Sequence, residues 1–309
     1  MKTITFVHPH AGNINVGSYR LQTLAPVRFL ERQFNSNYKF EIVKDVAEAT
    51  ASDIIVCMQI NDIGRALEIK KTKPQIKIVG FQSDGPRGEP ALLRQLDAVV
   101  IDSVSLEWSI PDGVKRLCHF PTPLEFPAGK YEAKKFPGGK QRIVYLGAKG
   151  NLFFAFDRIQ ALRAKGFDIS ILSDCDTTDI KWNVETYADD LNKFDVGIVP
   201  YPTNLQVPDD HGFTNFFYKD PSRPTVLQAV GLPVVVAPLP SYLGYIQHGE
   251  NGLIANTDAE WMECLSVLQT DSEVYERISA QGLHTSRSVS NTSLDMWRRL
   301  ICLLCADNA

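Results

Sequence analysis

Short apolar runs alternate with amphipathic segments along most of the chain. The runs are continuous rather than mixed with polar residues, which is typical of strands buried on both faces of a parallel sheet. The segments between them repeat apolar residues at helical spacing, so the pattern predicts an α/β layer fold. We expect strands at TITFVHP, KFEIVKD, SDIIVCMQ, IKIVGFQSD and LDAVVIDS in the first half, and at RIVYLG, FDISILSD, FDVGIVPY and LPVVVAP in the second.

The alternation fails once, in the stretch FPTPLEFPAGKYEAKKFPGGKQ. This stretch is rich in Pro, Gly and Lys and has no sustained period, so we interpret it as an interdomain linker. The predicted parts are a doubly wound domain (1–125), the linker (126–141), a second doubly wound domain (142–287) and a closing amphipathic helix (288–309). Ligands of open α/β sheets bind outside the carboxyl ends of the strands, so we expect the site in a cleft between the domains.

Composition narrows the class of protein. The 309 residues are 44% hydrophobic and 22% charged, as expected for two globular domains. The formal net charge of −4 provides no basic field, which argues against nucleic-acid binding. No apolar run approaches the ~20 residues that span a bilayer, and the N-terminus lacks a secretory pattern. Six sparse cysteines are typical of a reduced protein, so we expect a cytoplasmic one.

The segment KDPSRPTVLQAVG places two cations beside the start of a predicted helix. Ser222 is the expected N-cap, Gly231 ends the helix, and Arg223 follows the cap with Lys219 about one turn upstream. A helix N-terminus already attracts anions, and cations there are unfavourable unless something negative compensates them. A bound diphosphate would compensate them, and so would an internal ion pair with Asp220.

The order of several motifs resembles the donor half of GT-B glycosyltransferases, most closely the retaining family 4 type. The shared parts are a strand ending in proline (195–200), the Gly-x-Pro-Val-Val segment (231–235) and the loop His-Gly-x-Asn-Gly (248–252). The segment GSYRLQTLAP is similar to the family's glycine loop. The likeness covers most of 142–285 well and 1–120 loosely. It implies two Rossmann-like domains that face a cleft, with the C-terminal helix packing back on the first domain.

The resemblance implies a hexosyltransferase-like enzyme that takes a nucleotide-diphosphate sugar as its donor. Lys219 and Arg223 would stabilise the charge on the leaving diphosphate, so no metal or other cofactor would be needed. Gly17 and Ser18 would bring backbone N–H groups to the phosphates, with Arg20 nearby. Transfer to a glycan or lipid-linked acceptor, as in polysaccharide biosynthesis, would retain the anomeric configuration. Further donor-side candidates are Gly147, Asn151, Pro200, Tyr218, Ser222 and Glu250.

The sequence departs from the family at its two glutamates, which are spaced eight residues apart. Val226 and Tyr218 occupy those positions. This puts in doubt the donor's sugar and base, and also activity itself. One alternative is therefore an inactive partner or sensor that binds nucleotide sugars. Another is a sugar-nucleotide epimerase, which would need a carboxylate acid/base pair in the cleft.

Three residues are candidates for the acceptor side. His10 follows the first strand, Asp84 lies in SDGPRGE, and Asp210 lies in the loop before the cations. Each also has an interpretation without a binding role: His10 as a solvated loop residue, Asp84 as part of a Gly/Pro turn, and Asp210 as part of a solvated lid.

Two other features allow more than one interpretation. Asp174 and Asp176 form an Asp-x-Asp that would chelate a metal in another transferase fold, but we interpret it as a strand-to-loop exit, because short acidic residues are common in turns. The basic stretch KYEAKKFPGGKQR suggests peripheral membrane contact, and a solvated linker explains it as well.

Overall fold

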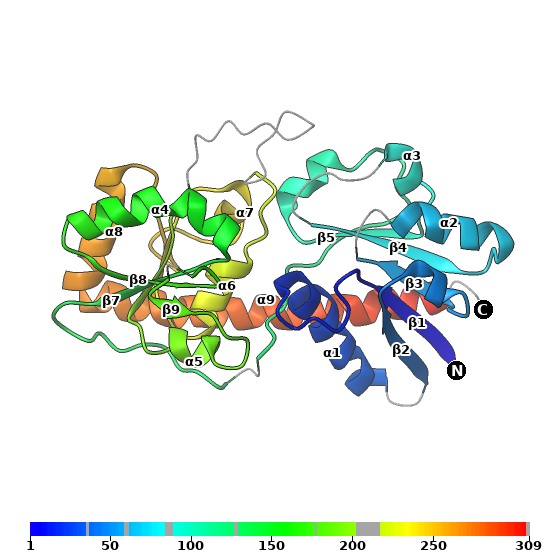
Figure 1. Cartoon of the computed structure of the whole chain (residues 1–309), viewed down its shortest axis with the longest axis horizontal. Helices are drawn as coiled ribbons and strands as arrows, with labels where there is room; N and C mark the ends of the chain where they lie inside the picture. The colour runs from blue at the N-terminus through cyan, green and yellow to red at the C-terminus, as the bar shows by residue number, and fades with distance from the viewer. Residues whose placement is uncertain are drawn as a thin grey trace. The chain divides into compact units, whose positions relative to one another are not determined.

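The computed structural model shows two compact α/β units (Figure 1). The first unit contains residues 1–125, 218–220 and 289–309, and the second contains residues 126–217 and 221–288. The structure describes residues 1–34, 37–58, 62–83, 89–126, 129–176, 178–201 and 217–306.

Each unit is built on a parallel sheet of six strands. The first sheet has the order β2-β1-β3-β4-β5-β6, and the second has the order β12-β11-β10-β7-β8-β9. All strand pairs within them are parallel, so the predicted α/β class with two doubly wound sheets is confirmed. The strands of the first sheet are β1 (Lys2–Val7), β2 (Tyr38–Val43), β3 (Ile54–Cys57), β4 (Lys77–Gln82), β5 (Ala98–Ile101) and β6 (Leu117–His119). Those of the second are β7 (Arg142–Leu146), β8 (Asp168–Ser173), β9 (Ile180–Lys181), β10 (Val196–Val199), β11 (Val234–Val236) and β12 (Leu253–Ile254).

Helices cover both faces of the first sheet. One face packs against α1 and the end of α9, where Phe6 and Phe81 contact the ring of Trp297. On the other face, Gly80 of β4 lies under Ile63 of α2, so a larger side chain at Gly80 would collide with it. The helical segments of this unit are η1 (Tyr19–Leu24), α1 (Ala25–Phe34), η2 (Val46–Ala49), α2 (Ile63–Thr72), α3 (Pro90–Leu93) and η4 (Val104–Ser109).

In the second unit, α4 and α8 lie on one face of the sheet, and α5 and α6 lie on the other (Figure 1). Arg158 of α4 pairs with Asp258 at the start of α8, which joins the two helices of the first face. The helices of this unit are α4 (Lys149–Ala164), α5 (Tyr187–Leu191), α6 (Ser222–Ala229), α7 (Pro240–Leu243) and α8 (Asp258–Thr270). Among the described residues, no helix is both long and apolar enough to cross a membrane.

The C-terminal helix α9 is longer than the sequence predicts. It runs without a break from Ser272 to Ala306, whereas the closing helix was expected to begin at residue 288. Gly282 within α9 has a packing role, because a Cβ there would lie 3.0 Å from the side chain of Gln228 and 3.1 Å from the carbonyl oxygen of Asn251. From residue 289 onward α9 belongs to the first unit, where Leu300 and Ile301 join the core.

Glycine ends two helices of the second unit in the same way. Gly231 after α6 and Gly166 after α4 have φ angles of +84° and +96°. The N–H of Gly231 donates to Gln228 O, and the N–H of Leu232 donates to Leu227 O. This is the Schellman arrangement, which satisfies carbonyl groups of the last turn and favours glycine at its left-handed position.

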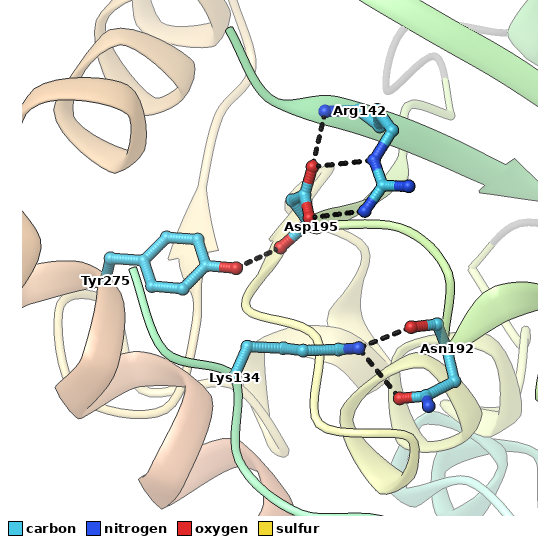
Figure 2. Close-up of polar contacts among 5 residues, drawn as sticks. All are labelled: Lys134, Arg142, Asn192, Asp195 and Tyr275. Atoms are coloured by element: carbon cyan, nitrogen blue, oxygen red, sulfur yellow. Dashed lines mark hydrogen bonds and ion pairs between the residues drawn. The ribbon is translucent and has the colours of Figure 1, made fainter. Parts of the chain in front are cut away.

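A charged cluster lies at the amino ends of β7 and β10 (Figure 2). The carboxylate of Asp195 accepts hydrogen bonds from the backbone N–H of Arg142 at 2.8 Å and from its guanidinium at 3.1 and 3.2 Å. Tyr275 of α9 donates to the carbonyl oxygen of Asp195 at 2.7 Å, and Lys134 donates to Asn192 Oδ1 at 2.8 Å. The cluster therefore ties the segment before β7 and the first turns of α9 to the sheet.

Three lysines of the expected basic patch, Lys130, Lys134 and Lys135, have partners within the second unit. Lys130 lies 2.9 Å from a carboxylate oxygen of Asp189, and Lys135 lies 2.9 Å from Glu276. Lys134 is held by Asn192, and burial lowers the pKa of its ammonium group. These contacts dock the segment between residues 129 and 136 onto the second unit.

Candidate functional site

Each sheet has one pair of neighbouring strands from which the chain leaves toward opposite faces. In the first sheet these are β1 and β3, and in the second they are β7 and β10. Ligands of doubly wound sheets bind at this topological switch point, because the departing helices leave a crevice outside the strand ends. The residues that follow these strands are therefore the first place to look for a site.

At the switch point of the second sheet, an arginine lies over an aromatic ring. The guanidinium carbon of Arg223 is 5.5 Å from the centroid of the ring of Tyr201, which lies two residues after the end of β10. Tyr201 is only 3% exposed, whereas Arg223 is partly exposed at the start of α6. Tyr145 of β7 is fully buried, and burial raises the pKa of its hydroxyl; Tyr201 adds to this rise, whereas the nearby charge of Arg223 opposes it. Two strands and a helix thus bring these side chains together.

Gly147 has a structural reason for being glycine. A Cβ at this position would lie 2.2 Å from the hydroxyl oxygen of Tyr145. The buried phenol of Tyr145 therefore occupies the space in which a side chain of residue 147 would begin.

The start of α6 differs from the expected cap. Pro221, not Ser222, is the N-cap residue, so the prediction of a Ser222 cap is wrong, and no side chain caps this end. Pro224 has no N–H group, and the N–H of Thr225 donates to Pro221 O at 3.0 Å. This helix end therefore presents fewer backbone donors than an ordinary N-terminus, and anion binding would depend more on side chains.

The residues just before α6 are held within the first unit. Asp220 is 8% exposed and accepts a hydrogen bond from Thr122 Oγ1 at 2.7 Å. Tyr218 is 2% exposed, and Lys219 between them is partly exposed. The carboxylate of Asp220 therefore has a neutral hydrogen-bond donor in addition to any nearby cation.

A pocket of about 700 Å³ opens beside the first turns of α4. It includes Pro200 at the end of β10, Cys175 after β8 and Lys149 at the start of α4, together with the exposed ring of Phe153. Sequence reasoning missed Lys149, although its place directly after a buried strand and a glycine was a signal for a ligand-facing cation. Of the other donor-side candidates, Asn151 lies in the first turn of α4 and Glu250 lies in an exposed turn.

The Asp-x-Asp segment serves local structure. The carboxylate of Asp174 accepts the backbone N–H of Lys149 at 2.6 Å, which satisfies a donor at the start of α4. Asp176 pairs with Lys181 at 3.0 Å. In the part of the chain that the structure describes, His, Cys, Asp and Glu side chains form no group of three that would hold a metal ion.

In the first unit, the glycine loop leads into a short π-helix, η1. A Cβ at Gly17 would meet no atom within 4 Å, so the backbone there is open to an approaching group. Ser18 is the N-cap of η1 and is partly exposed. Arg20 is 8% exposed, pairs with Glu125 and donates to Ile14 O at 2.8 Å. Its charge is thus compensated inside the unit.

The two histidines after β1 have different environments. His8 is 1% exposed, packs against the ring of Tyr19, and accepts the backbone N–H of His10 on Nδ1 at 3.1 Å. Burial, with a smaller contribution from His10, lowers the pKa of His8 to about 4, so its imidazole is neutral near pH 7. His10 itself is exposed. The sequence pointed to His10, but the constrained imidazole is that of His8.

A buried polar network follows β4 and β5 and was not predicted. Gln22 of η1 donates to Ser83 Oγ at 3.0 Å and to Asp102 Oδ2 at 2.9 Å. Asp102 is 0% exposed, so this network fixes η1 against the carboxyl ends of two strands. The acceptor-side candidates Asp84 and Asp210 lie outside the described residues.

Neither a family model nor a curated protein matches the sequence, but solved structures share the fold. A sucrose-phosphate synthase from Thermosynechococcus elongatus aligns over 99% of this chain and 100% of its own, with a TM-score of 0.69 at 11% identity. HepE of Anabaena, in complex with UDP and glucose, aligns over 99% and 100%, with a TM-score of 0.61 at 10% identity. The lipopolysaccharide outer core galactosyltransferase WaaB aligns over 96% and 99%, with a TM-score of 0.60 at 11% identity. The two doubly wound units are therefore those of the GT-B fold.

Proposed function

We propose that the protein is a retaining, metal-independent glycosyltransferase that uses a nucleotide-diphosphate sugar. The observation that supports this most strongly is the place of Arg223, whose guanidinium lies at the switch point of the second sheet beside Tyr145 and Tyr201. Similarity to glycosyltransferases along almost the whole chain, one of them in complex with UDP and glucose, supports the same class of donor.

The chemistry requires positive charge where the glycosidic bond breaks. The leaving nucleoside diphosphate gains negative charge in the transition state, and preorganised cations stabilise that charge more than they stabilise the bound donor. In our proposal Arg223 holds the diphosphate through paired N–H groups, and Lys219, four residues earlier, adds a compact charge. Because the turn at Pro221 and Pro224 is poor in N–H groups, these side chains contribute most of the stabilisation.

Donor contacts would differ from those of family 4. The two family glutamate positions hold Tyr218 and Val226, which are 2% and 6% exposed. Buried side chains of these types cannot present a carboxylate to sugar hydroxyls, so we propose that the sugar and ribose are held by other groups. In the first unit, Gly17 and Ser18 are candidates for contacts to the diphosphate, and the exposed His10 is a candidate for the acceptor side, where a glycan or lipid-linked hydroxyl would bind.

Release of UDP from UDP-glucose tests this proposal, with EDTA present throughout and with water or soluble glycans as acceptors. We expect turnover by the wild type and a loss of at least about a hundredfold in Arg223→Ala, since one donor to a developing oxyanion contributes about 10²–10³ in rate. Arg277→Ala is the matched control, because Arg277 is an exposed cation of the second unit on α9. NMR of the product should show a retained α-anomer.

Two results would contradict the proposal. Turnover that is abolished by EDTA and restored by a divalent cation would contradict the metal-independent mechanism. Tight UDP binding without transfer to any acceptor would instead support a nucleotide-sugar-binding protein without catalysis.

A further inference from the structure

The contact between Arg223 and Tyr201 does more than bury an aromatic ring. The ring of Tyr201 is 3% exposed and is therefore fixed by packing, whereas the partly exposed Arg223 ends a flexible side chain. A guanidinium attracted to a ring face at 5.5 Å loses rotational freedom that it would keep in water. This contact involves the face of the ring, so the in-plane N–H groups of the arginine remain suited to a phosphate.

A second buried tyrosine, Tyr145, lies near the ring of Tyr201. Tyr145 lies near both Tyr201 and Arg223, because both act on the pKa of its hydroxyl: Tyr201 raises it further and the charge of Arg223 opposes the rise. Gly147 in turn leaves the space that the Tyr145 hydroxyl occupies, because a Cβ there would approach it to 2.2 Å. The hydroxyl of Tyr145 thus lies against Gly147 at the end of β7 and near the Tyr201 ring that Arg223 covers.

We propose that Tyr201 is a positioning residue, which orients the Arg223 guanidinium toward the diphosphate of the donor. This rests on the proposed function, in which Arg223 binds that diphosphate. In this proposal Tyr201 does not contact the donor, and it affects donor binding only by orienting Arg223. Removal of the ring would remove one restraint on the arginine, so that ordering its guanidinium on a bound ligand would cost more conformational entropy and would weaken binding.

Isothermal titration with UDP and with inorganic pyrophosphate tests this, using wild type, Tyr201→Phe, Tyr201→Met and Arg223→Ala. Phenylalanine keeps the ring, whereas methionine keeps much of the volume without it. We expect Tyr201→Phe to stay within about twofold of wild type and Tyr201→Met to bind UDP and pyrophosphate about five- to twentyfold more weakly. Uridine is the control ligand, because its binding should not depend on either residue.

A double-mutant cycle separates positioning from simple packing. In the Arg223→Ala background, Tyr201→Met should cause no further loss of UDP affinity, since there is no guanidinium left to orient. An equal loss in both backgrounds would show that Tyr201 only supports the fold and would overturn the proposal. Gly147→Ala gives a second route that leaves Tyr201 intact, and it should weaken pyrophosphate binding through the displaced Tyr145.

The outcomes distinguish this inference from the proposed function. If Arg223→Ala binds UDP and pyrophosphate more weakly than wild type does, but Tyr201→Met binds them as wild type does, only the positioning role is wrong. If Arg223→Ala binds both ligands as well as wild type does, the proposed diphosphate site is wrong and the positioning role fails with it. If wild type binds neither ligand, both are wrong.

Discussion

Gly231 is the position where the backbone geometry makes the sharpest prediction. It ends α6 with a φ of +84°, and a Cβ added there would lie 2.0 Å from the carbonyl oxygen of Glu132. Gly166 ends α4 with a φ of +96° and the same pair of Schellman hydrogen bonds, but a Cβ there would meet nothing within 4 Å. The two glycines therefore share one conformational requirement and differ in one contact.

The expected loss of stability follows from treating the cost of the left-handed conformation and the cost of the steric contact separately. A left-handed conformation costs an alanine about 1–2 kcal/mol, and the lower entropy of its unfolded chain returns up to about 1 kcal/mol. Gly166→Ala should therefore lower the free energy of unfolding by about 1 kcal/mol. Gly231→Ala must also displace a backbone oxygen, which adds about 1–3 kcal/mol as in other overpacked sites. We predict a difference of about 2 kcal/mol between the two variants.

Urea unfolding followed by circular dichroism measures both variants under the same conditions. Fluorescence of Trp261 reports on the second unit, in which both glycines lie, because that side chain is buried on α8. Equal destabilisation by the two alanines would refute the reasoning, since it would mean that the Glu132 contact relaxes without cost.

Two further predictions concern other parts of the molecule. Asp195→Ala should lower the free energy of unfolding by about 2 kcal/mol, because the backbone N–H of Arg142 loses a charged acceptor. Titration of the same variant should show an unchanged affinity for UDP, because the charged cluster lies at the amino ends of the strands. His8 has a folded-state pKa of about 4, below its unfolded value of about 6.5, so its neutral form is favoured in the folded state and stability falls as the pH drops between these values. From pH 7 to pH 5 this should remove about 2 kcal/mol in wild type, and urea midpoints of His8→Gln should lack that part of the decrease.

Much of the fold was predictable because most of its strands are continuous apolar runs in the sequence. Runs such as IIVC in β3 and VGIV in β10 are buried along their whole length, which only a sheet covered on both faces allows. The missed strands β6, β9 and β12 are two or three residues long, too short to show any period. The start of α9 at Ser272 was missed, because Gly282 lies within this helix and in sequence a glycine needed for close packing resembles one that ends a helix.

The candidate site was predictable only in part. The cations Lys219 and Arg223 follow from helix-start chemistry, because a charge at that position is visible in the sequence itself. The contact with Tyr201 is not, since it depends on how two parallel strands meet at the switch point. His8 and Gln22 were missed for a similar reason: their burial and partners come from the tertiary structure, whereas exposed His10 has the same local sequence context as His8.

The most direct test of the account is a thermal-shift panel of UDP, GDP, CDP and ADP with wild type, Arg223→Ala and the control Arg277→Ala. A ligand that binds only the folded state raises the melting temperature by mass action, so no acceptor has to be known. We predict that one nucleoside diphosphate stabilises wild type and Arg277→Ala but not Arg223→Ala. Stabilisation of all three proteins alike, or of none, would contradict the assignment of the diphosphate site to Arg223.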